Sequence, residues 1–445
     1  MLEKPLEEVD IIAKHRSERF SRLSKEGFWI ILGQALTLLG SVVGVRVLTG
    51  MLNPAAYGEL ALAVTVATLV GQTIFGPLGN GVMRFYAPAV EHGDFPGYLS
   101  AVTQLVITAT WIIFVLIPCA AAVLFFVDRR DLIVITSAAL LFALVSGYNS
   151  VLTGIQSASR QRAIVALHQA MEAWVRFLFA AALLPWFGGR SSIAMAAYAF
   201  AALAVLTSQF LFFRKRIELT DSRDAGQAWR QQIWRYSWPF STWGIFTWAQ
   251  LSADRWALQI FGRTSDVGLY TVLFQLGYYP ISIAIGIAMQ FLTPIFYERS
   301  GDAKDTRRQT AVSNFSRRLM LLTLAATAAA FLLASTVHAL VFAVFVSKDY
   351  ARMSYLLPWM ILAGGIFAAG QTVALNLMTQ MRTEAMAVAK ISTAVLGVAF
   401  TFLGAYWYKT PGVVIAAVSF SVLYLLWMVV VQSTTKSQKQ SPEQI

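Results

Sequence analysis

Charged side chains are scarce in this sequence of 445 residues, of which only 13% are Asp, Glu, Lys or Arg. Soluble globular proteins carry roughly 25%. A soluble chain of this length would need a charged surface on each of its domains, and this composition cannot supply one. The apolar and aromatic residues, 57% of the chain, would instead cover a surface that faces lipid. We therefore expect an integral membrane protein.

Cysteine is almost absent too, and the one cysteine, Cys119, excludes an internal disulfide and a cysteine-rich metal site. No ATP-binding Gly-x-x-x-x-Gly-Lys-Ser/Thr loop and no His-Glu-x-x-His motif occurs. Metal-ligand spacing is also missing among the four histidines, which are His15, His92, His168 and His338. We expect no cofactor and no metal, and we expect a transporter rather than an enzyme.

Long apolar runs dominate what is present. A helix needs roughly 20 mostly apolar residues to cross the hydrocarbon core. None of the runs shows the alternation typical of membrane strands, so we expect an all-α polytopic membrane protein. Twelve runs are long enough, and they lie near 28–49, 57–83, 101–127, 132–157, 163–187, 191–213, 237–261, 268–293, 318–346, 353–380, 385–408 and 411–431.

Lysine and arginine are unevenly shared between the two sides of the predicted membrane. With a cytosolic N-terminus, the cytosolic segments carry 24 of them and the outer loops carry 7. Since positive charge marks cytosolic loops, both termini are expected inside the cell. Because the charges separate apolar spans, the net charge of +12 does not indicate nucleic acid as a partner. The four lysine and arginine residues that lie within the spans, rather than in the loops or tails, are Arg46, Arg176, Arg255 and Lys390.

A weak internal repeat divides the spans into two halves. Gly58 opens the second span and Gly268 opens the eighth, 210 positions later. Because each half has six spans, the copies should be parallel repeats about an axis along the membrane normal. Two such pseudo-two-fold-related bundles can rock around a site at the midplane. The predicted parts are a tail at 1–27, a six-helix bundle at 28–213, a linker at 214–236, a second bundle at 237–431 and a tail at 432–445.

Polar residues recur every four positions along the second span, namely Thr68, Gln72, Gly76, Asn80 and Arg84. On a helix they form one stripe. The stripe would be either the wall of a cavity or a set of hydrogen bonds between helices. Arg84 could alternatively reach the cytosolic headgroups.

The fifth span carries His168, Glu172 and Arg176 at the same spacing. Glu172 and Arg176 can form an i,i+4 ion pair near the bilayer centre. The pair would be a neutralised structural feature. Alternatively, Arg176 would reach an anionic substrate while Glu172 carries a coupling ion.

The seventh span contains Asp254 next to Arg255, and Arg46 holds a similar place in the first span. Adjacent helix positions point about 100° apart, so Asp254 and Arg255 need not pair. Each arginine could reach the outer interface. Alternatively, the two guanidinium groups would face each other across a cleft and bind phosphate, while Asp254 carries a coupling ion.

Tryptophans crowd the seventh span and its approach, at Trp229, Trp234, Trp238, Trp243, Trp248 and Trp256. Such residues are typical of the membrane interface. Those deeper in the span could instead stack on sugar rings.

Three short segments resemble a known family. They are LTGMLNPAAYG at 48–58, GNGVMRF at 79–85, and a stretch from Asp254-Arg255 through FGRTSDVGLY ending at Tyr270. These segments resemble polysaccharide-unit flippases of the multidrug/oligosaccharidyl-lipid/polysaccharide exporter superfamily. The family often has an arginine where this chain has Gly50, and Arg46 lies one turn earlier.

The resemblance implies a flippase of a bacterial inner membrane that moves a polyprenyl-pyrophosphate-linked oligosaccharide outward for cell-surface polysaccharide synthesis. Its substrate-binding residues would be Arg46, Gln72, Asn80, Arg84, Arg176 and Arg255. Partners would be the lipid-linked oligosaccharide, membrane lipids, a coupling proton or sodium ion, and polymerase or export proteins. The alternatives are an ion-coupled drug exporter of the same superfamily, a membrane-embedded glycan polymerase and a pore. The basic residues within spans favour an anionic cargo, and the short outer loops leave no room for a catalytic domain.

Overall fold

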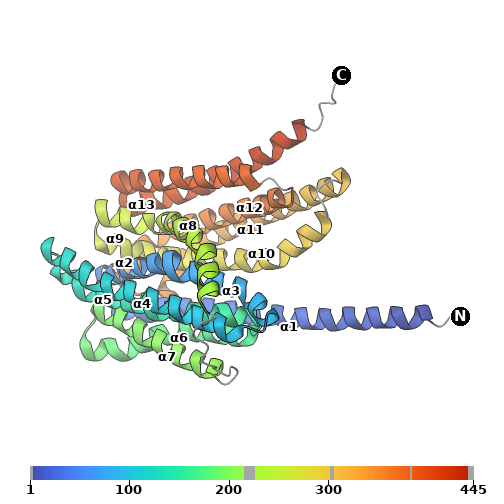
Figure 1. Cartoon of the computed structure of the whole chain (residues 1–445). Helices are drawn as coiled ribbons and strands as arrows, with labels where there is room; N and C mark the ends of the chain where they lie inside the picture. Colours follow the sequence, from blue (N-terminus) through green and yellow to red (C-terminus); the bar gives the residue numbers. More distant parts are fainter. Residues whose placement is uncertain (1–3, 215–225, 301–304, 381–382, 439–445) are drawn as a thin grey trace.

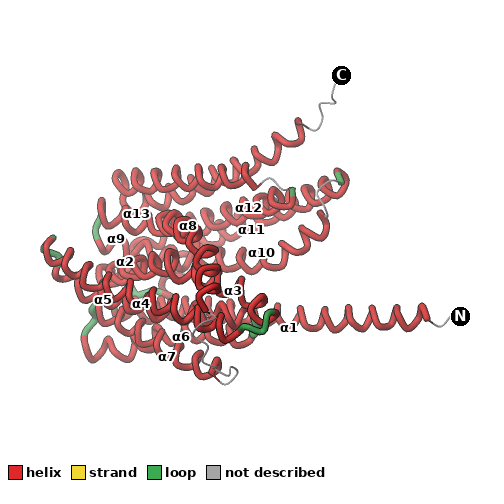
Figure 2. Tube along the Cα trace, in the orientation of Figure 1, coloured by secondary structure: helices red, strands yellow, loops and turns green. Residues whose placement is uncertain are grey.

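The computed structural model of the chain describes residues 4–214, 226–300, 305–380 and 383–438. These residues form helices joined by short connections and contain no strand (Figure 2). The helices run side by side in one elongated bundle (Figure 1). The all-α prediction is confirmed.

The first half of the chain contains seven α-helices. Asn53 caps the second of them, because its side-chain oxygen accepts a hydrogen bond from the backbone N–H of Ala56 at 2.9 Å. Pro54 follows at the first helical position, which favours a helix start. The elements are α1 (Lys4–Met51), α2 (Pro54–Val70), η1 (Gly71–Phe75), α3 (Gly76–Glu91), α4 (Phe95–Phe126), η2 (Arg130–Leu132), α5 (Ile133–Ala158), α6 (Arg162–Phe187) and α7 (Ser191–Arg214).

The second half repeats this order of long helices. As in the first half, its second span is interrupted by a π-helical turn, here η3. The elements are α8 (Gly226–Phe261), α9 (Thr264–Leu273), η3 (Phe274–Tyr278), α10 (Tyr279–Ser300), α11 (Thr306–Phe345), η4 (Lys348–Leu356), α12 (Leu357–Thr379) and α13 (Thr383–Gln438).

The last element, α13, is a helical hairpin rather than one rod. Lys409 has φ 53° and ψ −133°, which breaks the helix. A Cβ added to Gly397 would lie 2.6 Å from the ring of Phe420. In a straight helix those two residues would be about 35 Å apart, at roughly 1.5 Å per residue. The chain therefore reverses at Lys409, between the runs predicted at 385–408 and 411–431.

Ten stretches of the described residues are long and apolar enough to cross a membrane. The last of them, Val388–Ser433, contains the hairpin, and α8 falls outside the ten. The chain is therefore a multi-pass membrane protein, whereas the number of twelve transmembrane helices stays a prediction.

Both ends of the described chain lie at the same end of the bundle. The start of α1 and the end of α13 are on the right in Figure 1, and we call this the terminal end. The opposite end is called the far end. The predicted tail at 1–27 is helical from Lys4 and continues α1 out of the bundle.

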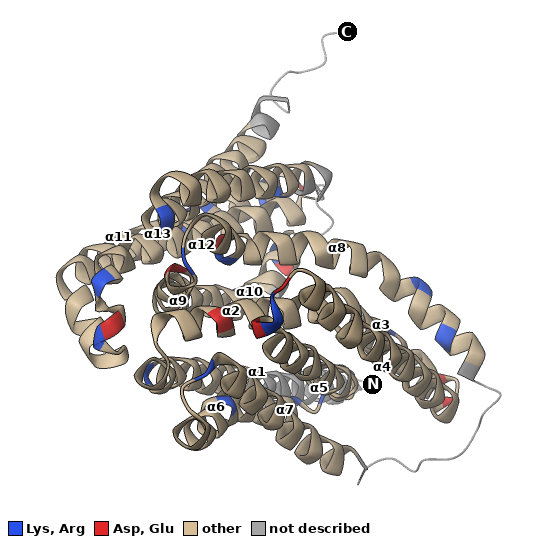
Figure 3. Ribbon diagram, turned by 90° about the vertical axis from the view of Figure 1, so that its left-hand side faces the viewer, with Lys and Arg blue, Asp and Glu red and all other residues tan. Residues whose placement is uncertain are grey.

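The two halves meet at the far end through a reciprocal backbone contact. A Cβ on Gly58 would lie 2.0 Å from the carbonyl oxygen of Thr264, and a Cβ on Gly268 would lie 2.0 Å from that of Pro54. The two pairings are equivalent in the repeat, because Gly58 and Gly268 are 210 positions apart and so are Pro54 and Thr264. Seen from the far end, α2 and α9 lie side by side in the middle of the bundle (Figure 3). Only glycine permits so close an approach, so the contact supports the predicted relation between the halves.

Candidate functional site

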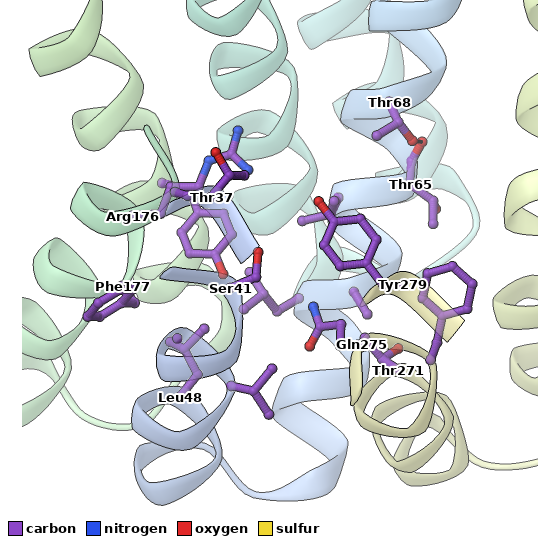
Figure 4. A pocket seen from close by; sticks show the side chains of 18 of the residues that line it. Thr37, Ser41, Leu48, Thr65, Thr68, Arg176, Phe177, Thr271, Gln275 and Tyr279 are labelled. Carbon is purple, nitrogen blue, oxygen red and sulfur yellow. Dashed lines mark hydrogen bonds between the residues drawn. The ribbon is translucent and has the colours of Figure 1, made fainter. Parts of the chain in front are cut away.

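A cavity of about 620 Å³ lies between the two halves. Its walls come from α1, α2, η1, α6 and α7 of the first half and from α8, α9, η3 and α10 of the second. In Figure 4, Thr37 and Arg176 lie on one side of this space, and Gln275 and Tyr279 lie on the other. The volume falls within the range of pockets that hold a drug-sized ligand.

The cavity is closed at the far end. Its lining residues there, such as Leu48 and Tyr57, are buried. The Tyr57 hydroxyl donates a hydrogen bond to the side-chain oxygen of Gln275 at 2.6 Å, across the two halves. Toward the terminal end, the lining residues Gln72 and Ser282 are exposed. The cavity therefore opens toward the end that carries both termini.

Most polar groups in the lining are uncharged. They are the side chains of Gln34, Thr37, Ser41, Tyr57, Thr65, Thr68, Gln72, Gln169, Tyr198, Trp248, Ser252, Thr271, Gln275, Tyr279 and Ser282. Hydroxyls and amides both donate and accept hydrogen bonds. Of the described residues that line the cavity, Glu172, Arg176 and Arg255 are the charged ones.

Glu172 and Arg176 form the predicted ion pair on the α6 wall. The guanidinium of Arg176 contacts the Glu172 carboxylate, and it lies over two aromatic rings, with its Cζ 4.9 Å from the Phe142 centroid and 5.8 Å from that of Tyr198. A quarter to a third of each charged side chain stays exposed, at 23% for Glu172 and 33% for Arg176. Both remain within reach of a ligand.

Arg255 lies on the α8 wall and does pair with its neighbour. Its Nη1 is 3.2 Å from the Asp254 carboxylate and donates to the carbonyl of Leu251 at 3.1 Å. The guanidinium also lies 4.9 Å from the ring centroid of Phe274. Asp254 does not line the cavity and stands behind Arg255. Although adjacent helix positions point about 100° apart, the arginine side chain is long and flexible enough for its guanidinium to reach the neighbouring carboxylate.

Arg46 lies outside the cavity lining and does not face Arg255 there. Its Nη1 donates to the carbonyl oxygen of Val346 at 2.5 Å, at the C-terminal cap of α11. Two further bonds lie beside it, from the Ser347 N–H to the Thr49 hydroxyl and from the Tyr350 hydroxyl to the Leu52 carbonyl. A cation is favourable at a helix C-terminus. Arg46 thus joins the end of α1 to the second half at the far end.

The polar stripe of the second span is divided by η1. Thr68 and Gln72 line the cavity, whereas Asn80 and Arg84 are exposed and lie outside the lining. The N–H of Gly76 bonds to the carbonyl five residues earlier, which adds one residue to the turn. One extra residue rotates the following side chains by about 100°. The structure therefore brings Gln72, Glu172, Arg176 and Arg255 together, but not Arg46, Asn80 or Arg84.

Several lining residues were missed by the sequence reasoning. Gln34, Thr37 and Ser41 line the cavity from α1, and their spacing of three and four was an available signal. Trp248 was not missed: it is one of the tryptophans predicted either to lie at the membrane interface or to stack on sugar rings, and it lines the cavity, where its indole N–H donates to the Thr65 carbonyl at 2.7 Å. His168 is buried elsewhere, with ring nitrogens 2.8 Å from the Ile164 carbonyl and 3.2 Å from the Ser208 hydroxyl.

The other tryptophans of α8 are either exposed or packed against the first half. Trp234, Trp238 and Trp243 are exposed on α8, as expected for an interfacial belt. Trp229 is buried, and its indole donates to the Asp94 carboxylate at 2.7 Å. The start of α8 therefore packs against the first half, although the repeat assigns this helix to the second.

Comparison of folds finds similar solved structures over nearly the whole chain. A lipid II flippase, MurJ, in an inward closed conformation has a TM-score of 0.70 at 11% identity, covering 92% of this chain and 87% of that one. An inward-facing multidrug resistance transporter of the MATE family and MOP superfamily has a TM-score of 0.66 at 16% identity, covering 92% and 96%. A MOP superfamily transporter from Pyrococcus furiosus gives 0.58 at 16% identity, covering 93% and 96%. These similarities establish the fold.

Sequence comparison locates the family. No curated protein sequence matches the chain. The sequence profile of a family described as polysaccharide biosynthesis protein matches residues 23–299, which is more than half of the chain. The match covers α2, α6 and α8, which carry much of the cavity wall. The chain therefore belongs to the polysaccharide biosynthesis protein family and has the fold of the MOP superfamily transporters.

Proposed function

We propose that this protein flips a polyprenyl-pyrophosphate-linked oligosaccharide from the cytosolic to the outer leaflet of a bacterial inner membrane. The observation that carries the proposal is the cavity between the halves, which is polar, closed at the far end and open at the terminal end. With the terminal end in the cytosol, the cavity would receive a headgroup from the inside. The lipid tail would stay in the bilayer, so only the polar headgroup would need a shielded path.

The two cavity arginines would bind the pyrophosphate. Guanidinium binds phosphate oxygens bidentately. Arg176 and Arg255 approach the space from opposite halves, on α6 and α8. Each forms an ion pair with a carboxylate, Arg176 with Glu172 and Arg255 with Asp254. The cargo would therefore bind by exchanging one anionic partner of each arginine for another.

This exchange would couple transport to protons. Once phosphate takes Arg176, the Glu172 carboxylate loses its cationic partner in a partly buried place, where an unpaired charge is unfavourable. Glu172 would then take up a proton and release it when the pyrophosphate leaves. Asp254, which pairs with Arg255 outside the lining, would be the second carrier of a coupling ion.

Export would require the far end to open. The contacts that close it are the Gly58–Gly268 approach, the Tyr57–Gln275 hydrogen bond and the Arg46 bond to α11. All three join the first half to the second. Arg46 would therefore stabilise the closed far end rather than bind cargo.

The test is reconstitution in liposomes with a fluorescent polyprenyl-pyrophosphate oligosaccharide. The double variant Glu172→Gln/Arg176→Gln removes both charges of one pair, so no uncompensated charge is left behind. We expect at least a tenfold loss of flipping at unchanged thermal stability, because a cation that binds the pyrophosphate is gone. Arg318→Gln, at an exposed position of α11 outside the cavity, is the matched control.

Two results would contradict the proposal. Wild-type protein that leaves the labelled lipid in its original leaflet, yet expels a cationic dye when a proton gradient is imposed, would identify an ion-coupled drug exporter instead. Full flipping by the double variant would remove Arg176 from the binding site.

A further inference from the structure

The cavity holds two arginines, and both are matched by carboxylates. Arg176 contacts Glu172, and Arg255 lies 3.2 Å from Asp254. Counting these four groups together, the fixed charge at the cavity is zero. Lys390, which the sequence placed within a span, and Arg46 and Arg84 lie outside the lining. The site is thus a balanced polar cavity rather than a strongly basic one.

A pyrophosphate would use the whole cationic capacity of this site. It presents two adjacent phosphates, and each suits one guanidinium. After both arginines have turned to the pyrophosphate, the described lining offers no further cation. A carboxylate or phosphate elsewhere in the cargo would then have to enter the cavity unpaired, and burying an unpaired charge is strongly unfavourable.

The uncharged part of the lining suits sugars. Amides and hydroxyls occur on all sides, with Thr37 and Ser41 on α1, Thr68 on α2 and Gln275 on η3. These groups can donate to and accept from sugar hydroxyls. Aromatic side chains, such as the lining residue Trp248, offer apolar faces for sugar rings.

We infer that the glycan carried by this flippase is electrically neutral, and that the pyrophosphate is the one anionic group the cavity accepts. The inference rests on the proposed flippase function and specifies its substrate class. The cavity would exclude an acidic sugar for an electrostatic reason, because the sugar carboxylate would find no cation to pair with. No steric barrier would be needed.

The experiment compares two polyprenyl-pyrophosphate trisaccharides that differ at one sugar, a neutral hexose in one and a hexuronic acid in the other. Both carry the same fluorescent label and are assayed in the same proteoliposomes. We expect the neutral lipid to flip at least ten times faster. Equal rates, or a faster acidic lipid, would overturn the inference while leaving the flippase function standing. If neither lipid moves, the proposed function fails and the inference falls with it.

A gain-of-function variant tests the cause. Thr68 lines the cavity and is exposed, so Thr68→Lys adds one cation that the pyrophosphate does not need. We expect it to raise the flipping rate of the acidic lipid at least threefold relative to the neutral one. Gln72→Lys serves the same purpose should Thr68→Lys not fold. Asn314→Lys, exposed on α11 outside the lining, adds the same charge elsewhere and should change neither rate. An equal gain from Asn314→Lys would refute the local charge explanation.

Discussion

The reciprocal glycine contact at the far end permits a sharp prediction. In Gly58→Ala the new methyl group would lie 2.0 Å from the Thr264 carbonyl oxygen and 3.0 Å from the backbone nitrogen of Gly268. Both neighbours are backbone atoms and cannot rotate away, so α2 and α9 must separate. Overpacking of this kind costs typically about 1–3 kcal/mol. The cost falls on the closed state, because the two helices need not touch once the far end opens.

The expected result is a shift of population toward the open far end by about 5- to 150-fold, at roughly 1.4 kcal/mol per factor of ten. A cysteine at Leu60, which is 3% exposed and lines the cavity near this contact, reports the shift. The measurement is its rate of labelling by a membrane-impermeant maleimide from the outer side, in a Cys119→Ser background. Faster labelling in Gly58→Ala, in protein that is still folded and inserted in the membrane, is the expected outcome.

Two further variants decide whether the reasoning holds. Gly268→Ala meets the Pro54 carbonyl at the same 2.0 Å, so it should reproduce the effect of Gly58→Ala. In the double variant Gly58→Ala/Gly268→Ala, the increase in labelling should be smaller than the two single effects combined, because helices already separated by one methyl group accommodate the second. Gly50→Ala has no neighbouring atom within 4 Å and should label at the wild-type rate. Wild-type labelling in both contact variants would refute the assignment of this contact as a gate.

The remaining predictions concern single side chains. Arg46→Gln removes the cation that donates a hydrogen bond to the Val346 carbonyl. Because the arginine is exposed, we expect the closed far end to be destabilised by only about 1 kcal/mol relative to the open one. Labelling of the cysteine at the Leu60 position should then be roughly fivefold faster. An unchanged labelling rate together with reduced cargo binding would return Arg46 to the substrate site. Glu172→Gln removes the group proposed to carry the proton while leaving Arg176 in place, so flipping should stop responding to an imposed proton gradient, measured in proteoliposomes with and without that gradient. A gradient response equal to that of the wild type would exclude Glu172 as the coupling group.

The helical architecture could be predicted from the sequence because the length and hydropathy of the apolar runs determine which segments form membrane-spanning helices. The turn at Lys409 falls between two predicted runs, and the structure places the reversal there. The repeat predicted that Gly58 and Gly268 are equivalent, and the structure adds that these two residues touch. Equivalence in sequence does not imply contact, so the contact itself could not be predicted from the repeat.

The candidate site was only partly accessible, and helical geometry explains why. Residues spaced by four are 400° apart on an α-helix, so each step drifts by about 40° from the last. From His168 to Arg176 the drift is about 80°, which is enough to turn His168 toward Ser208 while Glu172 and Arg176 face the cavity. The direction of Arg46 depends instead on where α11 ends, at Val346, which no pattern within the first span reveals.

The π-turns explain the rest of the discrepancy, and they connect backbone geometry with the chemistry of the cavity. Each half carries one in its second span, at η1 and η3, and both turns contribute lining residues, with Gln72 in one and Phe274 and Gln275 in the other. Because a π-turn inserts one residue, it changes which set of side chains faces the cavity before and after the turn. At η1 the turn also meets α8, where a Cβ on Gly244 would lie 2.0 Å from the Gln72 carbonyl oxygen. A regular helix through η1 would therefore change which polar groups face the cavity and how closely α8 approaches, so the lining of the cavity depends on a backbone irregularity that residue types alone do not specify.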